Sequence, residues 1–245
     1  MTHDVVVAAR QLAPMNRIAV LADVHSNLPA LDAVLGEIAR EGFDRVVSAG
    51  DLVSGPMPVE CLERLRALDV PVDWVRGNAD RLAAALPAHD PHPMDVFAHE
   101  RLSPEQRAFC ADWPGTVRIG GVLVCHGTPD SDEGIVTAVT PPARLAAILD
   151  GVVAPLVVGG HVHHQFAAER WVNAGSVGMP YEGRAGAFWL ELAAGEPILR
   201  HTDYDVEAAL AAVAATGYPL LDDLAPILRG EVGAAEAAEA LEARC

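Results

Sequence analysis

The chain has 245 residues, 51% of them hydrophobic, which is enough for one large domain with a sizeable buried core. Its 34 acidic and 17 basic residues give a formal charge of −17, which disfavours nucleic-acid partners because those require cations that neutralise phosphates. All the basic residues are arginines, so the sequence excludes mechanisms that need a lysine, such as Schiff-base chemistry, pyridoxal phosphate attachment or a P-loop.

Segments that would place the chain in a membrane or export it are not expected. The longest apolar run, at 145–160, is interrupted by Asp150 and Pro155 and is shorter than the roughly 20 residues that span a bilayer. Residues 1–16 lack the features of a secretory signal and are interpreted as an N-terminal lead-in. No CxxC pair occurs, which predicts reduced thiols at Cys61, Cys110, Cys125 and Cys245. We therefore expect a cytoplasmic protein without a membrane partner.

The first part of the chain alternates short β-branched runs with helical patterns. Strands are predicted at 17–22, 45–49 and 72–75, with helices at 28–41 and 57–68. Asn27 is the predicted N-cap of the first helix, in which apolar residues recur at helical spacing. This alternation is typical of βαβ units and a parallel sheet.

The later part of the chain follows a different pattern. Helical patterns and the proline-broken PAHDPHPM segment predict a helical cap over a cleft at 81–112. Further strands, with few helices between them, are predicted at 116–125, 155–159, 166–173, 186–192 and 197–203. A helical stripe of Val206, Leu210 and Val213, followed by an alanine-rich end, predicts a C-terminal helical appendage at 205–245. The fold class expected for residues 17–204 is α/β, a four-layer α/β/β/α sandwich of two mixed sheets flanked by helices.

Polar residues that can bind metals follow several of the predicted strands. They are Asp23, His25, Asp51, Asn78, His126, His161 and His163. The carboxyl ends of parallel strands form the ligand-binding edge of an open sheet, so we expect these side chains to meet there. Taken singly, each also fits a helix cap, a turn or a core histidine. Together they offer seven nitrogen and oxygen donors without a thiolate, which is too many for one tetrahedral ion and suits two Mn, Fe, Zn, Ni or Co ions.

The order of these motifs resembles a known family. D-x-H, G-D, G-N, a later histidine motif and G-H-x-H occur in the order found in the calcineurin-like metallophosphoesterase superfamily, over roughly residues 17–204. The segments HGTP at 126–129, NAGSVGMP at 173–180 and TDYD at 202–205 are similar to a bacterial branch related to small phosphodiesterases. The resemblance implies the metal-dependent phosphatase fold.

It also implies a dinuclear centre whose ligand sets share Asp51. One ion would be held by Asp23, His25, Asp51 and His163, and the other by Asp51, Asn78, His126 and His161. Two divalent transition metal ions are implied, with Mn favoured and Fe, Zn, Ni or Co as alternatives. A bridging hydroxide would attack a small phosphate ester, preferably a diester, without a covalent enzyme intermediate. The candidate catalytic residues are Asp51, Asn78, Asp80 and His126.

One position departs from the family pattern. Relatives with the fuller motif carry a histidine after the metal-binding asparagine, where it assists the leaving oxygen, but this chain has Ala79, so Asp80 lacks the histidine it would orient. Losing general-acid assistance costs about 10²- to 10⁴-fold in rate, and least when the leaving group departs easily as an anion. We therefore expect activated aryl diesters to be better substrates than alkyl monoesters.

Other residues could supplement the site, each with a structural role as the alternative. The candidate substitute acids are His164, His89, His92 and His99. Residues that adjoin the motifs, with turn or capping roles equally expected, are Asn27, Arg76 and Ser176.

Three other functions fit parts of the pattern. A subunit of the retromer trafficking coat uses this fold as an interaction scaffold with a degraded metal site, but here all seven positions keep a ligand-capable side chain. The metallo-β-lactamase signature HxHxDH is not completed by GHVHHQ. A nuclease is disfavoured by the acidic charge and the missing lysines. The expected partner is a small phosphate ester, with a homo-oligomer left open and a metal-binding scaffold as the alternative function.

Overall fold

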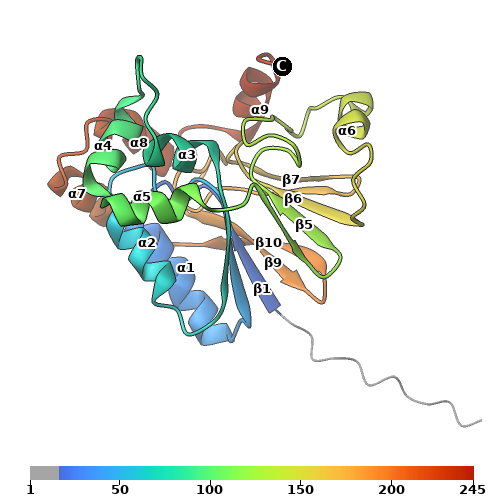
Figure 1. The fold of residues 1–245 in the computed structure, drawn as a ribbon, viewed down its shortest axis with the longest axis horizontal. Helices are drawn as coiled ribbons and strands as arrows, with labels where there is room; N and C mark the ends of the chain where they lie inside the picture. The colour runs from blue at the N-terminus through green and yellow to red at the C-terminus, as the bar shows by residue number, and fades with distance from the viewer. Residues whose placement is uncertain (1–16) are drawn as a thin grey trace, which may run out of the picture.

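The computed structural model describes residues 17–245, and the predicted lead-in at 1–16 lies outside this range (Figure 1). Two five-stranded mixed sheets form its centre. Sheet A has the order β10 (Glu196–Thr202), β9 (Ala187–Ala193), β1 (Arg17–Leu21), β2 (Arg45–Ala49) and β3 (Val72–Val75). Sheet B has the order β4 (Thr116–Ile119), β5 (Val122–Cys125), β6 (Leu156–Gly159), β8 (Trp171–Ala174) and β7 (Gln165–Ala168). The central strands β1–β2–β3 and β5–β6–β8 are parallel, and the remaining strands pair antiparallel.

The strand β1 shows how the layers are specified by alternation. Ala19 and Leu21 pack into the core beneath the helices, whereas Ile18 and Val20 pack into the core shared by the two sheets. This separation follows from the two-residue period of a strand, which sends successive side chains to opposite faces. Because both faces are covered, the parallel strands read as continuous apolar runs.

Helices cover the outer faces of both sheets (Figure 1). On sheet A, α1 (Leu28–Glu41) and α2 (Pro58–Arg66) contribute apolar side chains such as Leu31 and Leu62 to the outer core. On sheet B, α6 (Pro142–Ile148) contributes Leu145, and Leu241 of α9 (Ala234–Glu242) packs against the same core. The predicted four-layer α/β/β/α sandwich is therefore confirmed.

Two of the strand predictions and two of the connections need correction. The runs at 116–125 and 166–173 are each a hairpin rather than one strand, turning at Gly120 and Glu169, whose φ angles are +58° and +53°. A helix that we did not predict, α6, separates β5 from β6, and another, α8 (Leu221–Leu228), lies between the predicted helical stripe at 206–213 and the alanine-rich end. The helix α8 contains Pro226, a residue that disfavours helix interiors, which explains why its pattern was not recognised.

The segment at 81–112 and the C-terminal residues pack on each other beside sheet A. The first segment contains the end of α3 (Asn78–Ala84), α4 (Pro93–Arg101) and α5 (Pro104–Ala111). Phe97 of α4 lies in one core cluster with Leu210 and Val213 of α7 (Val206–Ala215) and Leu228 of α8. The predicted helical stripe of α7 is thus buried against the segment at 81–112. Between residues 17 and 245, no helix combines the length and apolar character that a membrane span requires.

Candidate metal centre

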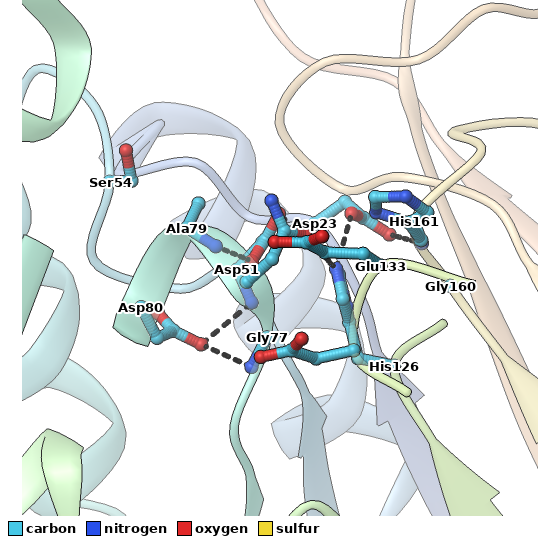
Figure 2. A network of polar contacts seen from close by, with 12 residues as sticks. Asp23, Asp51, Ser54, Gly77, Ala79, Asp80, His126, Glu133, Gly160 and His161 are labelled. Atoms are coloured by element: carbon cyan, nitrogen blue, oxygen red, sulfur yellow. Dashed lines mark hydrogen bonds and ion pairs between the residues drawn. The ribbon is translucent and has the colours of Figure 1, made fainter. Parts of the chain in front are cut away.

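Seven predicted ligand residues meet where the parallel strands of both sheets end. Asp23 and His25 follow β1, Asp51 follows β2 and Asn78 follows β3. The second sheet adds three histidines, His126 after β5 and His161 and His163 after β6. Figure 2 shows Asp23, Asp51, His126 and His161 converging from these different strands.

Potential ligand atoms form two adjoining groups, and within each group all the atoms lie within 4.8 Å of one another. The first group is Asp23, His25 and His163, and the second is Asp51, His126 and His161. The side-chain oxygen of Asn78 lies 3.1 Å from Nε2 of His126, at the second group. This division matches the two ligand sets implied by the resemblance.

The carboxylate of Asp51 lies between the two groups. Its Oδ2 is 3.3 Å from Nε2 of His126 in the second group and 3.7 Å from Nε2 of His25 in the first. Its other oxygen, Oδ1, accepts the backbone N–H of Ala79 at 2.8 Å, which fixes the orientation of the carboxylate. One oxygen is therefore anchored to the backbone and the other faces both groups of histidines.

Asp23 is anchored in the same way and leaves a buried oxygen without a partner. Oδ2 accepts the backbone N–H of His161 at 2.9 Å (Figure 2). Oδ1 is buried, has no hydrogen-bond partner among residues 17–245, and lies 3.2 Å from Nε2 of His163. A buried carboxylate oxygen without a partner is costly, so this atom indicates a missing cation or proton.

Three histidine rings are oriented by backbone carbonyls. In each ring Nδ1–H donates to a carbonyl: His25 to Ser54 (3.1 Å), His126 to Ala49 (3.0 Å) and His163 to Met179 (2.8 Å). This arrangement places the lone pair of each neutral ring on Nε2, the atom that faces the centre. The Nε2 atoms of His25 and His163 are only 3.2 Å apart, a distance at which two lone pairs repel unless a cation or proton lies near them. The donor set therefore fits two borderline divalent ions.

The buried carboxylates give the centre a strong negative potential. Burial lowers the pKa of His126, but the charges of Asp51 and Asp23 outweigh this effect and raise it to about 10. His163 shows the same balance, with Asp23 raising its pKa against burial. In contrast, burial and the neighbouring His126 lower the pKa of His161 to about 4. Without metal, protons on two of the histidines would balance the carboxylates, and cations can take over this role.

The backbone at the centre adopts an unusual conformation. Five of the candidate ligands have left-handed φ angles, which are +52° at Asp23, +43° at His25, +53° at Asp51, +69° at His161 and +60° at His163. Non-glycine residues adopt this region rarely and at a free-energy cost, and such residues concentrate at functional sites. The tight turns after the strands direct consecutive polar side chains toward a single point.

Asp80, predicted as catalytic, holds the backbone that carries Asp51. Its carboxylate accepts N–H groups of Asp51 (2.7 Å), Leu52 (2.8 Å), Val53 (3.0 Å) and Gly77 (3.0 Å). Figure 2 shows the contacts with Asp51 and Gly77. Asp80 is fully buried and its carboxylate is occupied by these four N–H groups, which favours a positioning role over the predicted catalytic one. Gly77 is needed here because a Cβ at this position would lie 2.1 Å from Oδ1 of Asp51.

A link between α4 and His25 was missed by the sequence analysis. The hydroxyl of Ser54, whose carbonyl orients the ring of His25, donates to the buried carboxylate of Asp95 at 2.8 Å. The pKa of Asp95 is raised, because the effect of burial exceeds the opposing effect of the Ser54 hydrogen bond. The sequence signal was weak, because an aspartate in the first turn of a helix is ordinarily explained by the helix dipole.

The proposed substitute acids have contacts of their own, none of them with a candidate ligand side chain among residues 17–245. His164 is buried in the core outside sheet B, where its ring lies beside Phe166, and its Nδ1 donates to the carbonyl of Val162. His99 donates to the carbonyl of Ala83, and His92 accepts the N–H of Met94 as the N-cap of α4. His89 is exposed in the connection between α3 and α4.

The residues that adjoin the motifs have structural roles. Asn27 caps α1 by accepting the N–H of Ala30 and donates to the carbonyl of Gly178. Arg76 donates to the carbonyl of Ala111. Ser176 donates to the carbonyl of Asp23 at 2.7 Å and thereby supports the turn that carries this ligand.

Solved structures with the same fold share little sequence with this chain. A metallophosphoesterase from Sphaerobacter thermophilus is 24% identical, with a TM-score of 0.73 over 88% of this chain and 99% of that one. A hypothetical protein from Pyrococcus horikoshii is 22% identical, with a TM-score of 0.72 over 88% of this chain and 98% of that one. At these identities the similarity establishes the fold.

Sequence comparisons identify the family. An uncharacterized protein of Methanocaldococcus jannaschii is 47% identical over 53 residues, which are 21% of this chain and only 22% of that relative. A model of the calcineurin-like phosphoesterase superfamily domain matches residues 16–194, which contain both strand-end ligand groups. The chain therefore belongs to the calcineurin-like phosphoesterase superfamily.

Proposed function

We propose that the protein is a dinuclear metal-dependent phosphoesterase that hydrolyses a small phosphate ester, preferably a diester, by direct attack of water. The observation that carries this proposal is the position of Asp51, whose Oδ2 lies 3.3 and 3.7 Å from histidine nitrogens of the two groups. A carboxylate between two groups of nitrogen and oxygen donors suits a pair of divalent ions. Mn²⁺ is the first candidate, with Fe, Zn, Ni or Co as alternatives, and the cytoplasm is the proposed location.

The residues of the centre have separate roles in this proposal. Asp23, His25 and His163 would hold one ion, while Asn78, His126 and His161 would hold the other, with Asp51 shared. When bound, two divalent ions activate water and stabilise the charge on a phosphoryl group. Asp80 fixes the loop of Asp51 through four backbone N–H groups, and the carbonyl of Ser54 fixes the ring of His25.

The proposal is tested by metal-dependent hydrolysis of bis-p-nitrophenyl phosphate. Metal-stripped protein should be inactive and should gain activity as Mn²⁺ is titrated to two equivalents, because both ions contribute to the site. Initial rates and calorimetric Mn²⁺ binding would be measured on the same samples. Protein that binds no metal would contradict the proposal and favour the interaction scaffold.

We also expect a strong dependence on the leaving group. Position 79 is a buried alanine without a proton to donate, so the leaving oxygen must depart with little assistance. Rates for a series of aryl diesters should fall steeply as the pKa of the leaving phenol rises, and alkyl monoesters should be slower by about 10²-fold or more. Similar rates for aryl diesters and alkyl monoesters would show that another group supplies the proton.

Metal binding should weaken in acid. The histidines must be neutral to coordinate a metal, so protons and metal compete for Nε2, and binding releases protons. Because the pKa of His126 is raised to about 10, protons compete for this ring throughout the neutral range, so Mn²⁺ affinity should fall steadily as the pH is lowered, and activity should be lost below about pH 6. Calorimetric titrations between about pH 5 and pH 8 would measure this effect, and equal affinity across that range would argue against histidine ligation.

A further inference from the structure

The connection between β8 and β9 encloses His163 on two sides. The carbonyl of Met179 accepts the Nδ1–H of His163 at 2.8 Å, and the N–H of Tyr181 donates to the backbone carbonyl of His163 at 2.9 Å. The ring of Tyr181 stacks on the imidazole, with centroids 4.8 Å apart and planes inclined by 25°. Tyr181 is thus held in a fixed position directly beside the first ligand group.

The phenol of Tyr181 has a free hydroxyl. Tyr181 is half-buried, and within residues 17–245 its hydroxyl forms no hydrogen bond. A phenol is protonated at neutral pH, so this hydroxyl can donate. Of the other two tyrosines, Tyr204 accepts a hydrogen bond from Asn27 at its hydroxyl oxygen, and Tyr218 packs against Phe97 in the cluster formed with α7 and α8. A fixed tyrosine with a free hydroxyl beside a polar centre is suited to ligand contact.

Some usual donors to a phosphoryl group are missing or already paired around Asn78. The chain has no lysine, and Ala79 stands where a donor histidine could be. Arg81, three residues after Asn78, pairs with Asp132 at 2.7 Å and Glu133 at 2.7 Å. Since hydrogen bonds to charged acceptors are stronger than neutral ones, one donor at this place would matter.

We propose that the hydroxyl of Tyr181 donates a hydrogen bond to a phosphoryl oxygen of the bound substrate, making Tyr181 a substrate-binding residue of this centre. This inference rests on the proposed phosphoesterase function. Its stack on His163 also gives Tyr181 a packing role, so the test must separate the ring from the hydroxyl.

Tyr181→Phe keeps the stacked ring and removes only the hydroxyl. The Mn²⁺-loaded variant should bind inorganic phosphate about 10- to 100-fold more weakly and show a similar loss in kcat/KM for bis-p-nitrophenyl phosphate. Its Mn²⁺ affinity should stay unchanged, because the ring that packs on His163 remains. Calorimetry would measure metal and phosphate binding, and steady-state kinetics would measure hydrolysis. Tyr218→Phe, a matched change outside the centre, should leave all three quantities unchanged.

The possible outcomes are distinct. Normal phosphate affinity and kcat/KM in Tyr181→Phe, beside an active wild type, would overturn this inference and leave the proposed function intact. A loss of Mn²⁺ affinity equal to the loss of phosphate affinity would also overturn it, because the tyrosine would then act only through His163. Wild-type protein that binds two Mn²⁺ ions but neither binds phosphate nor hydrolyses the diester would overturn the proposed function together with this inference.

Discussion

Replacing Asp51 by asparagine is expected to lower Mn²⁺-dependent diester hydrolysis by more than about 10³-fold, since changes to groups that only support metal ligands already cost about 10- to 100-fold. The substitution keeps the size of the side chain but removes the charge that faces both histidine groups. An amide can still offer one neutral oxygen, but its NH₂ group cannot serve as a ligand. Calorimetry should therefore show weaker binding of Mn²⁺, with the second equivalent affected most. Initial rates at saturating Mn²⁺ would give the loss in activity.

A matched control lies at the opposite end of the neighbouring strand. Asp73 in β3 forms an ion pair with Arg45 at 2.5 Å, away from the strand ends that carry the ligands. Asp73→Asn removes the same charge from the chain and should leave the activity within about twofold, because partly exposed ion pairs contribute little. If Asp51→Asn were as active as Asp73→Asn, Asp51 could not be the shared ligand.

Asp80→Ala is expected to destabilise the metal-free protein by about 3 to 5 kcal/mol, as four buried N–H groups lose their acceptor. Water that enters the cavity would reduce the free energy lost for each N–H group, but the loop at 51–53 would no longer be fixed. Asp80→Asn should be intermediate, because its oxygen still accepts while its NH₂ group opposes backbone donors. Urea unfolding of metal-free protein would measure both changes.

Asp203→Asn provides the control for stability, since the side chain of Asp203 is 93% exposed and contacts His201 at 3.5 Å. Its free energy of unfolding should lie within about 0.5 kcal/mol of that of the wild type. Near-normal unfolding of Asp80→Ala would mean that the four N–H groups find other acceptors and that the conformation of the loop does not depend on Asp80.

The sequence predicted the layers and the location of the centre because both depend on local patterns. Short β-branched apolar runs identify strands, and residues such as Asp51 and His126 lie immediately after them, at the edge where parallel strands end. Hairpins were harder, because the turn at Glu169 uses a residue without a turn signature. The helix α8 was not predicted because it contains Pro226, a residue that disfavours helix interiors.

The contacts that support the centre could not be predicted, because they join residues distant in the chain. The pair Ser54 and Asp95 is separated by 41 positions, and neither residue belongs to a recognisable motif. Tyr181 approaches His163 only because the connection after β8 folds back along the end of β6. The four hydrogen bonds that Asp80 accepts likewise depend on how the loop at 51–53 curves around α3, which is decided by tertiary packing.

The left-handed backbone at five candidate ligands places folding and activity in competition. Glycine at His161 or His163 would relieve strain on the order of 1 kcal/mol while removing a candidate ligand, so natural selection for stability alone would erode the site. A lineage that no longer needed the activity could drift toward glycine at these turns without losing the fold, and protein engineers who seek a more heat-resistant variant should leave them untouched.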